Sequence, residues 1–216
     1  MIAQKLVAEG LGTALLVCAV VGSGIMADRL TADTAVALLA NTAATVAALF
    51  MLITIIGPIS GAQFNPVVTL VFTLRGELSR GLALAYTAAQ VLGGIAGTWI
   101  AHAMFELPVL QLSQTIRTGP AQWLAEGVAS FALLLAILGA INARANVAAV
   151  VACVIAAAYW FTASTSFANP AVTLARALTD TFAGIRPLDA PMFIAAQVVG
   201  ALVAMAIGGW LFRQPK

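Results

Sequence analysis

The sequence predicts an all-α membrane protein with six transmembrane helices and two re-entrant half-helices, arranged as an inverted repeat. Three observations predict this class. Of the 216 residues, 62% are apolar and 8% are charged, against roughly 25% charged residues in soluble domains. The mean hydropathy of +1.03 indicates that most of the chain lies in lipid. Finally, motifs in the first half of the chain recur in the second half.

Six apolar stretches are long enough, or nearly so, to cross about 30 Å of hydrocarbon at about 1.5 Å per helical residue. A lipid-exposed backbone must satisfy its own hydrogen bonds, and the stretches lack the alternation of barrel strands, so each one is expected to be a helix. The predicted spans cover residues 6–27, 34–56, 80–105, 121–141, 146–164 and 191–212. The first is interpreted as a retained span, because it is too long for a signal peptide and contains a glutamate.

Two shorter apolar segments, residues 65–74 and 169–178, reach only about 15 Å, half of the distance across the membrane. Each begins with Asn-Pro. Asparagine suits the N-cap of a helix and proline suits its first position. Gly76 follows the first segment, where a helix would stop. The sequence therefore predicts two half-helices.

Three motifs occur twice: residues 8–13 (AEGLGT) and 125–130 (AEGVAS), residues 65–70 (NPVVTL) and 169–174 (NPAVTL), and residues 89–93 (AQVLG) and 196–200 (AQVVG). Each half then holds three spans and one half-helix. An odd number of spans per half makes the second copy enter from the opposite face, as in inverted repeats whose broken helices meet at the midplane. We expect one domain, residues 1–216, with halves of about 1–110 and 118–216.

Charge and cysteine content exclude several function classes. The net charge of +2 comes with no basic run, so nucleic-acid binding is not expected. Cys18 and Cys153 lie in apolar runs without a second ligand at metal-binding spacing. No metal site or cofactor is expected, and no nucleophile–base pair indicates an enzyme.

The orientation follows from the lysines and arginines, which favour the cytoplasmic side. With the N-terminus inside, six of the ten lie in cytoplasmic segments: Lys5, Arg75, Arg80, Arg144, Arg213 and Lys216. This bias predicts that both termini are cytoplasmic.

The Asn65-Pro66-Val67 and Asn169-Pro170-Ala171 boxes resemble the paired boxes of the major intrinsic protein family, the aquaporins and aquaglyceroporins. The glutamates of the first and fourth spans and the Gln-x-x-Gly motifs extend this resemblance over the whole chain. The resemblance implies an aquaporin-like fold, a homotetramer and a multi-pass protein of the cell inner (plasma) membrane. It also implies that Glu9 and Glu126 accept hydrogen bonds from the re-entrant loops.

The boxes also indicate a function on physical grounds. Two helix N-termini that face each other carry about half a positive charge each, which opposes a passing cation. Asn65 and Asn169 can cap their helices through the side-chain oxygen and turn amide donors toward a passing oxygen atom. We therefore predict a passive channel for water and glycerol-like polyols that excludes protons and ions. The alternative is an ion-coupled secondary transporter, in which Glu9 and Glu126 would relay protons.

In most family members an arginine follows the second box, whereas this chain has Val172. By counting from the boxes, the other constriction positions fall at Thr45, Ala157 and Ser166. None of the four is aromatic or charged, so we expect a wider and less polar pore that admits larger neutral solutes. Bacterial aquaporins that lack this arginine resemble channels associated with arsenic handling. Neutral arsenous acid is therefore the specific solute that we predict.

Two polar side chains complete the set of candidates. Arg176 lies four residues after Val172 and hence on the same helical face. Either Arg176 reaches the vestibule and partly replaces the missing cation, or it stabilises the C-terminal end of its helix. His102 is expected to be an interfacial residue near the outer end of the third span.

Overall fold

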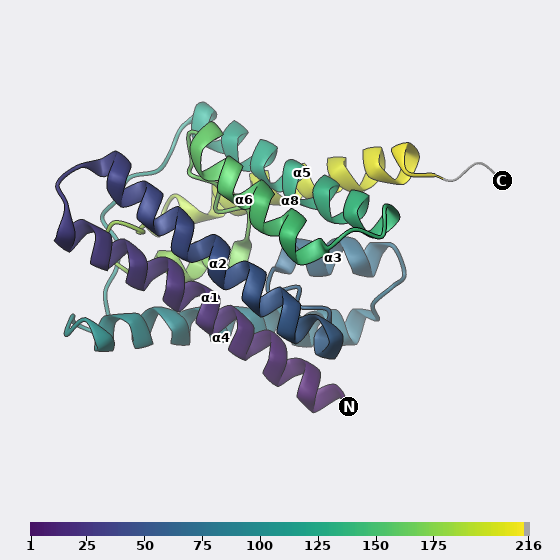
Figure 1. The fold of residues 1–216 in the computed structure, drawn as a ribbon, viewed down its shortest axis with the longest axis horizontal. Helices are drawn as coiled ribbons and strands as arrows, with labels where there is room; N and C mark the ends of the chain where they lie inside the picture. The colour runs from purple at the N-terminus through teal and green to yellow at the C-terminus, as the bar shows by residue number, and fades with distance from the viewer. Residues whose placement is uncertain (214–216) are drawn as a thin grey trace.

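The computed structural model describes residues 1–213, and within them the chain forms eight α-helices (Figure 1). Lys216, which was counted above as a cytoplasmic cation, and the last three residues of the predicted second half lie outside the described residues. The helices are α1 (Ile2–Leu30), α2 (Thr34–Ser60), α3 (Pro66–Leu74), α4 (Arg80–Met104), α5 (Pro120–Asn142), α6 (Val147–Phe161), α7 (Pro170–Arg176) and α8 (Ala190–Leu211).

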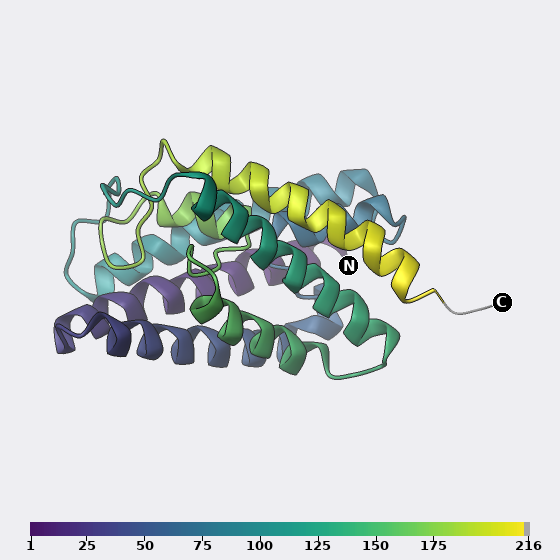
Figure 2. The same cartoon turned by 90° about the horizontal axis from the view of Figure 1, so that it is seen from above.

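The longer helices run roughly along the long axis of one bundle, and the start of α1 and the end of α8 lie toward the same end of it (Figures 1 and 2). α1 packs most extensively on α4, and α5 packs in the same way on α8. α2 and α6 contact each other and join the two halves. The predicted architecture of six longer helices and two half-helices is confirmed.

Four helices are long and apolar enough to cross a membrane by themselves: α1, α2, α5 and α8. α4 has 25 residues but carries polar side chains such as Gln90 and His102. α6 has only 15 residues and ends at Phe161, three residues before the predicted end. The chain leaves α6 early because Ser164 turns inward and its hydroxyl donates a hydrogen bond to the Glu126 carboxylate.

The two half-helices begin where Asn-Pro places them. Asn65 is the N-cap of α3 and Asn169 is the N-cap of α7, each with proline in the first turn. α7 ends at Arg176, two residues before the predicted end. Its last carbonyl accepts a hydrogen bond from the backbone N–H of Ile185, 3.2 Å away, because the following segment folds back along the helix.

Glycines bring the long helices of each half into backbone contact. A Cβ atom added to Gly93 of α4 would lie 2.1 Å from the Gly10 carbonyl oxygen of α1. In the second half, a Cβ atom on Gly200 of α8 would lie 2.1 Å from the Gly127 carbonyl oxygen of α5. Only glycine permits this approach. The same device thus holds α1 on α4 and α5 on α8, and it fixes the frame in which the half-helices sit.

Candidate functional site

The two half-helices meet end to end at their capping asparagines. The Asn65 side-chain oxygen accepts the Val67 N–H at 3.1 Å. The Asn169 oxygen accepts the N–H groups of Ala171 at 3.0 Å and of Val172 at 3.3 Å. Each asparagine therefore satisfies donors that the first turn of its helix leaves free.

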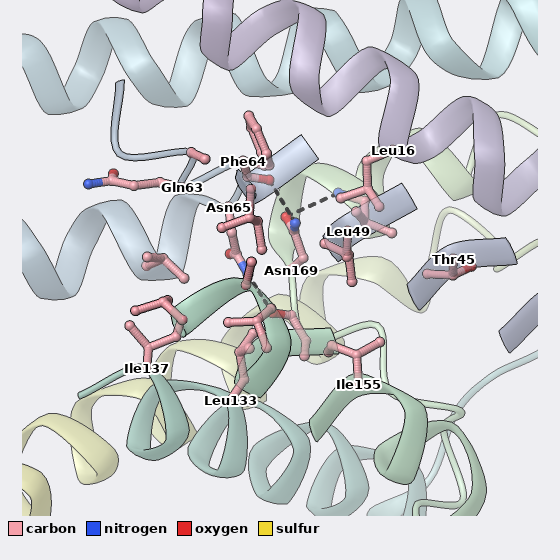
Figure 3. Close-up of a pocket in the computed structure, with 18 of the residues that line it drawn as sticks. Leu16, Thr45, Leu49, Gln63, Phe64, Asn65, Leu133, Ile137, Ile155 and Asn169 are labelled. Atoms are coloured by element: carbon pink, nitrogen blue, oxygen red, sulfur yellow. Dashed lines mark hydrogen bonds between the residues drawn. The ribbon is translucent and has the colours of Figure 1, made fainter. Parts of the chain in front are cut away.

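The amide nitrogens of the same two side chains cross to the opposite half. Asn65 Nδ2 donates to the Ala168 carbonyl oxygen, and Asn169 Nδ2 donates to the Phe64 carbonyl oxygen, each at 2.8 Å. Figure 3 shows both side chains in the middle of the cavity. An amide nitrogen carries two hydrogens, so one hydrogen of each remains after this contact. Pro66, Val67, Pro170 and Ala171 do not line the cavity; they build the first turns behind the asparagines.

Glu9 of α1 anchors the first re-entrant loop. One of its carboxylate oxygens accepts the Ser60 hydroxyl at 2.6 Å and the Gln63 N–H at 3.0 Å. The other accepts the Phe64 N–H at 2.7 Å and the Gln90 amide at 2.9 Å. The carboxylate is fully buried, and these four donors compensate for the loss of water.

Glu126 of α5 makes the equivalent set of contacts in the second loop. One oxygen accepts the Ser164 hydroxyl at 2.6 Å and the Phe167 N–H at 2.8 Å. The other accepts the Ala168 N–H at 2.9 Å and the Gln197 amide at 2.6 Å. Glu126 is also fully buried. The two carboxylates thus hold the backbone of the two loops in one matching arrangement.

Both loops use backbone conformations that side chains rarely adopt. Residues with positive φ recur at corresponding positions of the two halves, 104 residues apart: Gly61 (92°) and Thr165 (60°), Ala62 (47°) and Ser166 (53°), and Phe64 (49°) and Ala168 (48°). A non-glycine residue in this region costs of order 1 kcal/mol or more. Hydrogen bonds to the buried carboxylates offset this strain, so the loop geometry depends on Glu9 and Glu126.

A cavity of about 560 Å³ extends on both sides of the asparagines. Its helical walls are stripes of residues four positions apart, which share one helix face. The longest stripes are Thr45, Leu49, Ile53 and Gly57 of α2; Leu133, Ile137 and Ile141 of α5; and Val147, Val151, Ile155 and Tyr159 of α6. We call its two ends the Asn146 end, at the α5–α6 connection, and the Arg176 end. The wall is thus mainly apolar, with polar groups in the loops and toward the ends.

Three of the four predicted constriction residues line this cavity: Thr45, Ser166 and Val172. The fourth, Ala157, was wrong, because it is exposed on the outer face of α6. Tyr159 lines the cavity instead, and its hydroxyl donates to the Thr45 hydroxyl at 3.3 Å. A difference of two residues turns a helical position by about 200°. The four-residue stripe in α6 is the signal that would have placed Tyr159 correctly.

The four predicted constriction residues are neither aromatic nor charged, but aromatic and charged groups lie beside them at the Arg176 end. Tyr159, Phe167 and Arg176 all line the cavity there. The Ser166 hydroxyl is buried there and has no hydrogen-bond partner within residues 1–213. Arg176, one turn beyond Val172, is only 3% exposed. The Arg176 side chain therefore reaches the cavity, as the hypothesis of a vestibule cation requires. It also lies at the C-terminal end of α7, as the hypothesis of a helix-terminal cation requires.

His102 differs from its predicted interfacial position. It is fully buried. Its Nδ1 lies 2.9 Å from the Val109 carbonyl oxygen, and its Nε2 lies 2.7 Å from the Thr179 hydroxyl. His102 thus connects the end of α4 to the segment after α7, a contact between residues 77 positions apart.

A family model described as Major intrinsic protein matches residues 1–146, about two thirds of the chain. Among curated proteins, aquaglyceroporin AqpS of Rhizobium meliloti (strain 1021) is 60% identical over 214 residues, which cover 99% of this chain and 92% of that protein. Aquaporin A of Dictyostelium discoideum is 35% identical over 137 residues, which cover 61% of this chain and 49% of that protein.

Among solved structures, the aquaglyceroporin from Plasmodium falciparum is similar with a TM-score of 0.72. The alignment covers 96% of this chain and 95% of that one at 19% identity. This likeness supports the overall fold.

Proposed function

The chain belongs to the major intrinsic protein family, and we propose that its cavity is the pore of a passive transmembrane channel for water and glycerol-sized neutral solutes. The family and the aquaglyceroporin relatives support a channel for water and glycerol. The protein is therefore an integral membrane channel and not an enzyme.

The observation that carries the proposal is the asparagine pair in the middle of the cavity. Asn65 and Asn169 each keep one amide hydrogen for an oxygen atom that passes between them. The N-terminal ends of α3 and α7 meet at the same place, and their partial positive charges oppose a cation. A neutral molecule with hydroxyl groups meets donors without such a barrier.

An ion-coupled transporter is not favoured. A proton relay needs carboxylates that can change their charge and partners during transport. Glu9 and Glu126 instead accept four hydrogen bonds each, and all of them come from loop or helix groups that define the fold. The contacts support loop-supporting roles for both residues.

Thr45, Ser166 and Val172, with Tyr159 in place of Ala157, are the selectivity filter in this proposal. Val172 leaves the wall without a cation at its own position, and Arg176 supplies one a turn further along. A mixed wall of hydroxyl, apolar and guanidinium groups suits a compact polyhydroxylated solute. Arsenous acid is neutral at pH 7 and carries three hydroxyls, so we include it among the proposed solutes.

The remaining proposals concern the assembly and its placement. Residues 1–110 and 118–216 form the two inverted halves of one channel domain. Four copies assemble as a homotetramer in the cell inner (plasma) membrane, with both termini in the cytoplasm. Under this orientation the Arg176 end faces outward. The start of α1 and the end of α8 lie toward one end of the bundle, which supports termini on one side (Figures 1 and 2).

Stopped-flow light scattering on proteoliposomes tests the proposed pore. Wild-type protein should admit water, glycerol and arsenous acid quickly and without saturation. Val172→Arg should lower the permeability to both solutes by about tenfold, a barrier increase of about 1.4 kcal/mol, while water flux changes less. Val172→Leu is the matched control, because it adds volume without charge.

Three outcomes would contradict the proposal in different ways. Water flux alone, unchanged by Val172→Arg, would remove the solute channel and leave a water channel. Equal effects of the arginine and leucine variants would exclude a role for charge at this position. Flux no faster than in empty liposomes, or saturation at low solute concentration, would support a transporter.

A further inference from the structure

Two arginines lie over one aromatic ring at the Arg176 end of the cavity. The guanidinium carbon of Arg176 is 3.4 Å from the centroid of the Phe167 ring, and that of Arg117 is 5.3 Å from it. Phe167 belongs to the second re-entrant loop, Arg176 is the last residue of α7, and Arg117 precedes α5. The ring thus joins the second re-entrant loop and the end of α7 to Arg117, which lies 50 residues earlier in the chain.

The ring itself is held in place by packing. Phe167 is 4% exposed, and its edge meets the ring of Phe193 of α8 at a centroid distance of 5.3 Å and an angle of 74°. Phe193 is fully buried. Such an edge-to-face pair restricts the orientation of both rings. Phe167 therefore offers a fixed π face to the arginines.

Each guanidinium has a second anchor beside the ring. Arg176 Nε donates to the Ala183 carbonyl oxygen, and Arg117 Nε donates to the next carbonyl oxygen, that of Gly184, at 2.8 Å. Within residues 1–213, the other nitrogens of Arg176 donate to no protein acceptor. A guanidinium has five N–H donors, and Arg176 lines the cavity. Its remaining donors are thus available to a solute.

Within residues 1–213, no carboxylate forms an ion pair with Arg117 or Arg176. Among the described residues, the ion pairs are Arg75 with Glu77 and Arg186 with Asp189. A buried cation without a carboxylate partner depends on its other contacts for compensation. For Arg176 these contacts are the Phe167 ring and the Ala183 carbonyl, and a desolvated cation–π contact is among the stronger ones of its kind.

The first half of the chain lacks this arrangement. The residues 104 positions before Phe167 and Arg176 are Gln63 and Phe72. Gln63 accepts a hydrogen bond from the Thr69 hydroxyl at 2.7 Å. Phe72 lines the cavity toward the Asn146 end. The stacked arginines therefore belong to one end of the cavity only.

We infer that Arg117 and Phe167 form a cation–π clamp that positions the Arg176 guanidinium on the cavity wall, where it acts as a specificity-determining group. Phe167 is a positioning residue in this scheme. The free N–H groups of Arg176 donate to the hydroxyl oxygens of neutral polyols one turn beyond Val172. The expected effect of the clamp on solute permeability rests on the proposed function. The clamp itself can be measured without any transport assay.

Solid-state NMR of protein labelled with ¹⁵N-arginine in lipid bilayers measures the clamp directly. The ring current of Phe167 should displace the guanidinium proton resonances of Arg176, and Arg176→Lys identifies them by their loss. Phe167→Leu should return them to the ordinary range, whereas Phe167→Tyr should keep them displaced. Phe72→Leu removes another cavity-lining phenylalanine, one toward the Asn146 end with no arginine of residues 1–213 over its ring, and should leave them in place. Identical Arg176 resonances in wild type and Phe167→Leu would overturn the clamp.

The ratio of glycerol to water permeability in proteoliposomes measures its consequence. Phe167→Leu and Arg176→Gln should each change this ratio by about fivefold, and Phe167→Tyr by less than about twofold. The double variant should match Arg176→Gln alone, because the two substitutions remove one interaction. Effects that multiply would overturn the positioning role. A wild-type protein without flux would refute the proposed channel, while the NMR result would still decide the clamp.

Discussion

The two halves of the molecule share their centre and differ at their ends. Each half has a buried glutamate with four donors, an asparagine that crosses to the other half and a glycine in contact with a backbone carbonyl. After α3 the chain turns at Gly76 and carries an exposed ion pair of Arg75 and Glu77. After α7, residues 177–189 fold back instead and bind the loop before α5.

The folded-back segment adds hydrogen bonds between two loops at the Arg176 end of the cavity. Its backbone pairs with the preceding loop where the Ser113 N–H donates to the Ala177 carbonyl and the Arg186 N–H donates to the Thr115 carbonyl. It also supplies the carbonyls that hold Arg117 and Arg176. From this difference we infer that the repeated core forms the channel, while the unrepeated segment sets the chemistry that the Arg176 end presents to a solute.

The largest effect on stability is expected at the glycines that bring α4 against α1 and α8 against α5. Gly200→Ala and Gly93→Ala should each destabilise the fold by about 3 kcal/mol, because the new methyl group meets a backbone carbonyl that cannot move aside easily. Thermal unfolding in detergent measures the loss. Gly209→Ala and Gly81→Ala are matched controls on the same helices, with open space at the new Cβ.

These controls should be neutral or stabilising by up to about 1 kcal/mol, since alanine is the better helix former. Equal losses at Gly93 and Gly200 would mean that the glycine contact is equally important in both halves. A tolerated alanine at only one of them would break the proposed symmetry of the frame.

An intermediate effect is expected at the loop anchors. Glu126→Gln and Glu9→Gln keep the side-chain shape but turn an NH₂ group toward donors, so each should cost about 2 kcal/mol. Denaturant unfolding measures the stability, and water permeability measures the loop geometry. Glu77→Gln, at an exposed ion pair, is the control and should change stability by less than about 0.5 kcal/mol. Loss of water flux without loss of stability would contradict the structural role and revive a proton relay.

The smallest effect on stability is expected from protonation of Asp189, near the Arg176 end, at acidic pH. Burial raises the pKa of Asp189, but hydrogen bonds from the Arg186 side chain and the Arg117 backbone, with the charge of Arg186, bring it below its ordinary value. This contribution to stability is present above the unfolded pKa of about 3.9 and is lost as the pH falls through the lowered folded value. Thermal unfolding between acidic and neutral pH measures it.

Asp189→Asn should remove this part of the acid dependence, whereas Asp180→Asn, at an exposed carboxylate of the same segment, should retain it. If Asp189→Asn loses as much stability in acid as the wild type, the carboxylate does not hold the Arg176 end.

Local chemistry explains what could be predicted from the sequence. An asparagine followed by proline starts a helix through contacts within three residues, so the half-helices at Asn65 and Asn169 were placed correctly. The repeated motifs predicted the matching halves, and the glutamates of α1 and α5 indicated where buried carboxylates would need partners. Composition and hydropathy predicted the membrane bundle.

The face of each helix that lines the cavity, and the distant side chains that meet there, depend on how the helices and loops pack in three dimensions. The rotation of α6 is set by its packing, so counting residues selected Ala157 where Tyr159 lines the wall. His102 and Thr179, or Arg117 and Arg176, are separated by many residues and are brought together by the fold of intervening segments. The helices, their first residues and their repeat could be predicted from the amino-acid sequence, because these features depend on neighbours along the chain. The chemistry of the Arg176 end depends on neighbours in space, which only docking of the segments supplies.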